Sequence, residues 1–283
     1  MLKCRAPAQT GVFCNKWMIK KSEIMKTVIY FLTTIIATSA GGVSGMGGGI
    51  IIKPVLDLMG DFTPQTIGVM SATTVFVMSL VSTWRNIRNG IEIKKDVAVT
   101  VALGSVAGGL AGQKIFSVIA SNAPDSAFVI RTQNIILFIV VMSILLYMKN
   151  KDRITSRDLK GAVPVFASGL VLGMIASFLG IGGGPLNVAI FIYLFSYSSR
   201  SAAACSLITV LFSQFSKLTL AAVGGDFAGV DWAILAPMLI AGVAGGFISG
   251  AISRRISDRG VDIVFNTIQV CVLGMCVINI VAA

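Results

Sequence analysis

The chain has 283 residues, of which 55% are hydrophobic and only 12% are charged, and its mean hydropathy is +0.87. Soluble domains carry about 25% charged residues, so this composition excludes an ordinary soluble domain and predicts a membrane protein. Histidine is absent and the five cysteines show no metal or redox spacing. We therefore expect no catalytic residues, no metal and no cofactor.

Ten apolar segments follow one another along the chain, approximately at 27–44, 48–59, 66–84, 96–119, 132–148, 162–180, 184–196, 201–223, 232–252 and 263–282. A complete membrane span needs about 20 residues. Segments 48–59 and 184–196 are too short for this, and each follows a run of glycines. We therefore predict two hairpins of broken or re-entrant helix, at 27–59 and 162–196, and six complete spans.

The two glycine runs are G-M-G-G-G-I-I-I-K at residues 45–53 and G-I-G-G-G-P-L-N-V at residues 180–188. They lie 135 positions apart, and the same offset relates Ser71 to Ser206 and Thr74 to Thr209. Glycine-broken apolar segments at corresponding places of two halves are typical of secondary transporters whose site lies between the repeats. The pattern predicts an all-α polytopic protein with membrane repeats at 26–150 and 161–283, joined by a basic cytoplasmic linker at 151–160.

Basic residues gather in the loops 85–95, 149–160 and 254–262, which predicts that these loops are cytoplasmic. The same bias favours membrane orientation as the reason for the formal charge of +11, and nucleic acid is not expected as a partner. If each hairpin returns to the side it entered, each half makes three crossings and the halves are inverted. Each repeat is then a hairpin followed by three transmembrane helices.

The first residues of the chain disagree with this topology, because they are basic although the predicted N-terminus lies outside. Two explanations are open. Either Met25 is the true start and residues 1–25 are a leader that is untranslated or disordered, or segment 27–44 crosses completely. We favour the first explanation.

Two stripes of small residues mark the fourth and ninth apolar segments. Glycines spaced by four residues allow helices to approach closely in lipid. We therefore predict that these positions pack against other helices: Gly104, Gly108, Gly112, Gly242, Gly246 and Gly250.

The glycine runs also suggest an anion site. A half-helix that begins at Gly48 or Gly183 directs free backbone N–H groups, and the positive end of its dipole, toward the membrane midplane. Glycine permits positive φ angles and a close approach of a ligand, and Pro185 suits the first helical turn. Two such N-termini that meet would bracket a small anion. The alternative is that the glycines only allow two helices to cross tightly.

Polar residues in the apolar segments supply further candidates. The helix after each hairpin carries a serine and a threonine, Ser71 with Thr74 and Ser206 with Thr209. We expect their hydroxyls either to complete the hydrogen bonds of the anion or to donate to carbonyls of their own helix. Lys53 attracts the anion, or else forms a surface ion pair with Asp57. Gln214 and Lys217 are additional candidates. The predicted substrate-binding set is Gly45, Gly47, Gly48, Gly49, Lys53, Ser71, Thr74, Gly180, Gly182, Gly183, Gly184, Asn187, Ser206 and Thr209.

The paired G-x-G-G-G motifs, each followed by a short apolar helix and a Ser/Thr-bearing span, resemble the TauE/SafE sulfite exporter family over residues 26–283. The resemblance implies a multi-pass transporter of the cell membrane, with sulfite, a sulfonate or another small sulfur-containing or organic anion as substrate. Lys53-Pro54 departs from the mostly apolar continuation that the family motif implies.

The sequence therefore favours a secondary transporter that binds a small anion between two half-helix N-termini near the midplane. An anion channel and a non-transporting membrane scaffold are the alternatives, and an enzyme is not expected. The expected partners are the anion and the lipid bilayer, and assembly into a homo-oligomer stays open. Saturable flux stimulated by counter-transport would distinguish a carrier from a channel.

Overall fold

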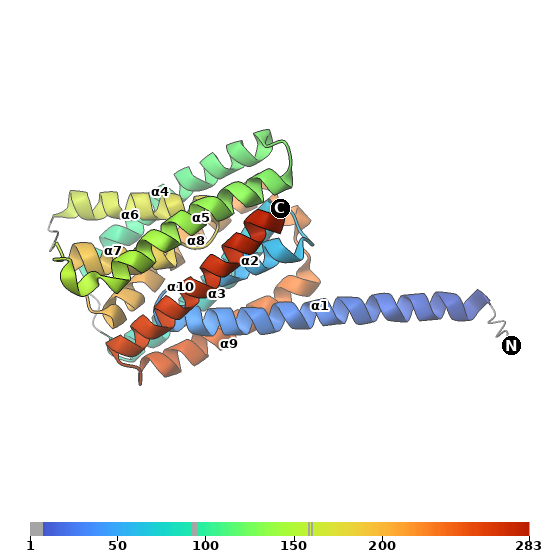
Figure 1. Cartoon of the computed structure of the whole chain (residues 1–283), viewed down its shortest axis with the longest axis horizontal. Coiled ribbons are helices and arrows are strands. Elements are labelled where there is room, and N and C mark those ends of the chain that lie inside the picture. The colour runs from blue at the N-terminus through green and yellow to red at the C-terminus, as the bar shows by residue number, and fades with distance from the viewer. Residues whose placement is uncertain (1–7, 92–94, 158, 160, 283) are drawn as a thin grey trace.

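The computed structural model describes residues 8–91, 95–157, 159 and 161–282, without the side chains of residues 8–23, 95 and 152. This part of the chain is helical and contains no strand. The long helices are α1 (Ala8–Ser44), α3 (Pro64–Arg88), α4 (Lys95–Asn122), α5 (Ser126–Lys149), α6 (Ala162–Leu179), α8 (Ser199–Gly224), α9 (Trp232–Ser253) and α10 (Asp258–Ala282). The short ones are α2 (Gly49–Met59), α7 (Gly184–Phe195) and the 3₁₀ turns η1 (Lys151–Arg153) and η2 (Asp226–Gly229) (Figure 1).

Two glycine turns interrupt the helices at matching positions. Three glycines in each turn have positive φ, a conformation that costs a residue with a Cβ atom but not glycine. The φ angles agree within 9°: they are 79°, 79° and 72° at Gly45, Gly47 and Gly48, and 70°, 79° and 69° at Gly180, Gly182 and Gly183. The chain therefore leaves α1 and α6 by the same backbone path and starts α2 and α7 in the same way.

Each glycine turn forms the tip of a helical hairpin. Lys26 in α1 forms an ion pair with Asp61, which follows α2, and the Tyr30 hydroxyl donates to the same carboxylate. In the second hairpin the Arg157 N–H, ahead of α6, donates to the carbonyl of Tyr193 near the end of α7, at 2.7 Å. Both short helices thus run back toward the end of the molecule from which the preceding helix comes.

Glycine stripes fix the relative directions of four helices. Successive glycines of α4, Gly104 to Gly112, face α6 from Phe166 to Met174. Successive glycines of α9, Gly242 to Gly250, face α3 from Thr74 to Arg85. The prediction that both stripes are packing faces is confirmed, and α4 runs parallel to α6 as α3 does to α9. Since α3 starts where the first hairpin opens and α4 starts where α3 ends, the two hairpins open at opposite ends of the molecule.

The described helices include eight that are long and apolar enough to cross a membrane. Six of them are the predicted complete spans, and the other two are the first arms of the hairpins, which also reach this length: Ile24–Ser44 has 21 residues and Ala162–Leu179 has 18. Each arm stays helical up to its glycine turn, since no earlier residue breaks the backbone hydrogen bonds. The second arms, α2 and α7, have 11 and 12 residues and are short, as predicted.

Helix α1 is continuous from Ala8, so the predicted boundary between a leader at 1–25 and the first repeat falls inside a helix. Its N-terminal part extends beyond the other helices (Figure 1). Residues 1–7 of that leader lie outside the described residues, as do 158 and 160 of the linker predicted at 151–160.

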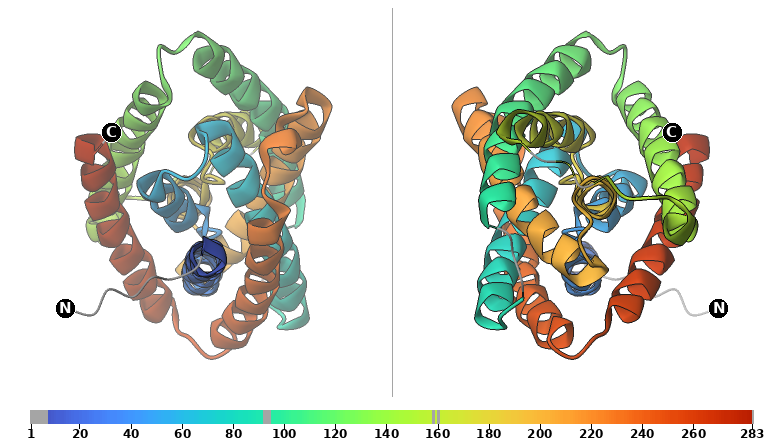
Figure 2. Two further views of the ribbon diagram at one scale, coloured as in Figure 1. Left: turned by 90° about the vertical axis from the view of Figure 1, so that its right-hand side faces the viewer. Right: turned by 90° about the vertical axis from the view of Figure 1, so that its left-hand side faces the viewer.

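The hairpins lie inside the helical bundle. Seen end-on, α4, α5, α9 and α10 lie toward the outside, and the short helices α2 and α7 lie within (Figure 2). Helix α8 packs on α7 and α3, and α10 packs on α2 and α5. This arrangement buries both glycine turns, and every residue of the ranges 41–50 and 179–185 is buried.

Candidate functional site

The two glycine turns contact each other through backbone atoms. A Cβ atom on Gly49 would lie 2.8 Å from the carbonyl oxygen of Ile181, and one on Gly184 would overlap the backbone of Met46. The two contacts are equivalent under the offset of 135, which relates Gly49 to Gly184 and Met46 to Ile181. Only glycine fits at positions 49 and 184, because any side chain there would separate the turns.

Val75 of α3 and Val210 of α8 enclose this crossing and are related by the same offset. Each valine lies close to both Gly47 and Gly182, with Cγ atoms 3.2–3.6 Å from the points where Cβ atoms would sit. The two valines therefore pack against both turns at the crossing, and a larger residue at either glycine would press against them.

Ser206 of α8 joins the two turns by hydrogen bonds. Its hydroxyl lies 2.7 Å from the carbonyl oxygen of Gly45 and 3.3 Å from that of Gly184. The equivalent Ser71 is fully buried, and its hydroxyl has no hydrogen-bond partner. The Thr74 and Thr209 hydroxyls donate within their own helices, to the carbonyls of Met70 and Cys205. Of the four predicted hydroxyls, the two threonines thus form local helix bonds and Ser206 contacts both turns.

The N-termini of α2 and α7 meet at the crossing. The residues before them, Gly48 and Gly183, provide no side-chain cap. The first N–H groups of an α-helix have no partner within the helix, and they carry the positive end of its dipole. Both ends are buried, so the protein has placed two electropositive helix termini in its interior.

Lys53 and Asp57 form an ion pair one turn apart on α2, with Nζ and Oδ2 2.9 Å apart. Their side chains are 3% and 1% exposed. The alternative of a surface pair with a snorkelling lysine is therefore wrong, because the second arm of the hairpin lies inside the bundle. The other carboxylate oxygen of Asp57 has no hydrogen-bond partner.

Polar side chains surround the second turn. Lys53 Cε and Lys217 Nζ lie 3.2 and 3.3 Å from the point where a Cβ of Gly180 would sit. Gln214 Nε2 lies 3.0 Å from the corresponding point of Gly182, and Asn187 Oδ1 lies 3.4 Å from that of Gly183.

All four polar side chains around this turn are buried. The amide oxygens and nitrogens of Asn187 and Gln214 have no hydrogen-bond partners. Gln214 and Lys217 were only additional candidates outside the predicted set, and the signal for them was a lysine within an apolar segment.

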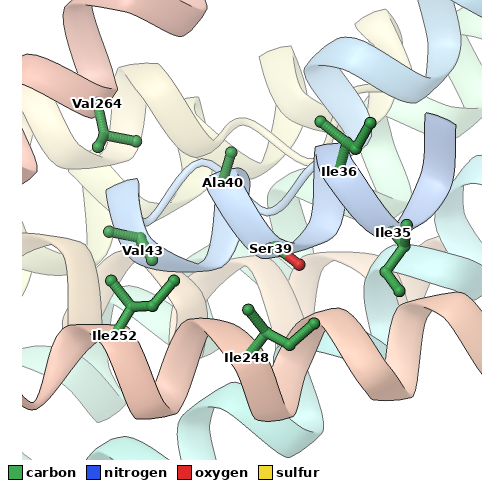
Figure 3. Close-up of a pocket in the computed structure, with 8 residues that line it drawn as sticks. All are labelled: Ile35, Ile36, Ser39, Ala40, Val43, Ile248, Ile252 and Val264. Atoms are coloured by element: carbon green, nitrogen blue, oxygen red, sulfur yellow. The ribbon is translucent and has the colours of Figure 1, made fainter. Parts of the chain in front are cut away.

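One surface groove away from the turns is mostly apolar. A groove of about 500 Å³ lies between α1, α9 and α10 and is lined by apolar residues with the exception of Ser39 (Figure 3). It contains no residue of either turn. Among the described residues no three His, Cys, Asp or Glu side chains gather as a metal site would require.

Comparison with known proteins identifies the family. The family model for the sulfite exporter TauE/SafE matches residues 30–275. The chain belongs to the TauE/SafE family. It is 24% identical over 274 residues to the probable membrane transporter protein YunE of Bacillus subtilis (strain 168), covering 88% of this chain and 96% of that protein.

A second relative, the probable membrane transporter protein YjnA of Bacillus subtilis (strain 168), is 23% identical over 240 residues, covering 80% of this chain and 90% of that protein. No solved structure matches the chain. The family and the apolar helices together show a multi-pass membrane transporter, and not an enzyme.

Proposed function

We propose that this protein is a secondary transporter of the cell membrane that carries a small anion, with sulfite, sulfonates and related organic anions as the substrate class. The observation that carries the proposal is the meeting of two uncapped helix N-termini at a buried crossing. Helix N-termini attract anions without needing a charged side chain. The description of the family as sulfite exporters supports the sulfur-containing class.

We also propose that the two halves are inverted repeats which move around this crossing. Hairpins that open at opposite ends of the molecule support this arrangement, as do the contacts that exchange under the offset of 135. Broken helices at the interface of inverted repeats are a common site of substrate binding in secondary transporters. The loops rich in lysine and arginine then face the cytoplasm.

The test is uptake of radiolabelled sulfite, methanesulfonate and acetate by proteoliposomes. The wild-type protein should show saturable uptake that is accelerated by unlabelled anion on the opposite side. Unsaturable flux without this acceleration would favour the channel, and absence of flux for every anion would contradict transport.

Two substitutions test the place of binding. Ser206→Ala removes the hydroxyl that contacts both turns and should lower uptake at least tenfold. Ser143→Ala is the matched control, because Ser143 is exposed on α5 and donates only to the carbonyl of Ile139. Equal uptake by both variants would contradict a site at the crossing.

A further inference from the structure

The surroundings of the two turns differ, although their backbones match. The atoms nearest Gly45, Gly47 and Gly48 belong to Ala203, to Val75 and Val210, and to the backbone of α1. At the second turn the neighbours include two lysines and two amide side chains. The positions equivalent to Lys53 and Lys217 are Val188 and Ser82, so the first turn has no counterpart of this cluster.

Lys217 is the decisive member of the cluster. It is 2% exposed, and among the described residues it forms no ion pair. Its Nζ lies beside Gly180 and also 3.2 Å from the point where a Cβ of Gly68 in α3 would sit. A buried ammonium without a counter-ion is costly, and buried charges in proteins are therefore paired or coordinated. Asp226, the first residue of η2, acts on it electrostatically without pairing.

Lys53 does not compensate for this charge, because it is a cation itself. Asp57 supplies one carboxylate for two lysines, and Lys53 occupies it at 2.9 Å. With both lysines protonated, the cluster holds one positive charge in excess. A bound anion with a single negative charge would balance it.

The amide groups supply the neutral part of such a site. Gln214 and Asn187 are each 1% exposed, and their amide atoms have no partners. Gln214 lies on the face of α8 that carries Ser206, Val210 and Lys217, since these residues are three or four positions apart. This face therefore runs from the crossing of the turns to the ammonium group.

We propose that the anion is bound at the second glycine turn alone, between Lys53 and Lys217 and with the Gln214 and Asn187 amides as further donors, and that this site selects small oxyanions with a single negative charge. The first turn then has a structural role. The inference rests on the proposed function and places its site off the axis that relates the two halves.

The test compares methanesulfonate with sulfate, which have similar shapes but one and two negative charges. The purified full-length protein is titrated with each in detergent by calorimetry, and its melting temperature is recorded without anion. Wild-type protein should bind methanesulfonate at least tenfold more tightly than sulfate. Lys217→Met should weaken methanesulfonate binding at least tenfold and raise the melting temperature of the empty protein, because an unpaired buried charge is removed.

Two controls separate this role from a structural one. Lys114→Met removes an exposed lysine of the membrane helix α4, and Ser82→Ala alters the position equivalent to Lys217. Both should bind methanesulfonate like the wild type. Unchanged methanesulfonate binding by Lys217→Met, or a lowered melting temperature of this variant, would overturn the inference. The proposed function would still stand if the wild type takes up anions. A wild type that transports none of the anions would overturn the proposed function itself.

Discussion

The turns at 45–48 and 180–183 share their backbone angles, their burial and their contacts with each other, but not their surroundings. Alanine and valine side chains and helix backbone enclose the first turn, and lysine and amide side chains approach the second. The difference teaches that the repeated backbone lets two hairpins cross, and that the side chains contributed by α2, α7 and α8 give one of the two turns its chemistry.

The largest expected effect tests the crossing itself. Gly184→Ala should prevent stable folding, because its Cβ would overlap the Met46 backbone, and overpacking of this kind costs about 1–3 kcal/mol or more. Gly49→Ala should cost less, since it meets the Ile181 carbonyl at 2.8 Å. Melting temperature in detergent is the measurement. Gly274→Ala, in open space on α10, is the control and should be neutral or stabilising. A Gly184→Ala protein that melts like the wild type would contradict the contact.

The next effect concerns charge at the second turn. Asp57→Asn leaves Lys53 without its partner and should destabilise the protein by about 3–5 kcal/mol. The double variant Lys53→Met/Asp57→Asn should recover most of this loss, because no unpaired charge remains at these two positions. Chemical denaturation in detergent gives both values. If the double variant were as unstable as the single one, the ion pair would not be the source of the effect.

Equivalent serines provide a smaller and direct comparison of the two halves. Ser206→Ala should cost about 1–3 kcal/mol, because it removes the buried hydroxyl that bonds to the carbonyls of Gly45 and Gly184. Ser71→Ala should be close to neutral, since its hydroxyl has no partner to lose. Thermal unfolding of the two variants side by side is sufficient, and equal losses would refute the asymmetry.

The smallest expected effect concerns the open ends of the two hairpins, of which only the first is held by a charged carboxylate within the described residues. The hydrogen bond from Lys26, followed by that from Tyr30, holds the pKa of the Asp61 carboxyl below its ordinary value. A depressed folded-state pKa stabilises the protein above the ordinary value of 3.8, and this stability is lost as the pH falls through the folded-state pKa.

Because the pair is partly exposed, Asp61→Asn should cost about 0.2–1 kcal/mol at neutral pH and nothing in strong acid. The second hairpin closes with backbone bonds at Tyr193 and Leu194 and should show no such loss. Hydrogen exchange of the two hairpins as a function of pH is the measurement. Equal acid sensitivity in both would remove the distinction.

Much of the architecture is predictable from local pattern. Glycine runs and apolar length predict both breaks and the short helices after them, because positive φ and membrane thickness act within a few residues. The residues that meet across the molecule are less accessible. Met46 and Ile181 are ordinary apolar residues, and the offset between the halves predicts the contact of one with its glycine, Gly184 or Gly49, only once the other contact is known.

The chemistry of the site was harder to predict than the fold. Symmetry in the sequence favoured Ser71 and Thr74 equally with Ser206 and Thr209, but a hydroxyl can donate to its own helix, and no local pattern decides this. Lys217 has an uncharged serine as its equivalent, so the repeat gives no support to a lysine there, and only its charge within an apolar segment marks it. Its proximity to Lys53 depends on how α2 and α8 pack around Gly180, which is a tertiary contact.

The count of two lysines against one aspartate has an electrical consequence. If both lysines are protonated, the empty centre carries one positive charge and the centre loaded with a monoanion carries none. A charge that is moved across the membrane field changes in energy by about 2.3 kcal/mol for each 100 mV. Voltage would then act on the return of the empty carrier and leave the loaded step unaffected, so the resting potential of the cell would set the direction in which the transporter resets.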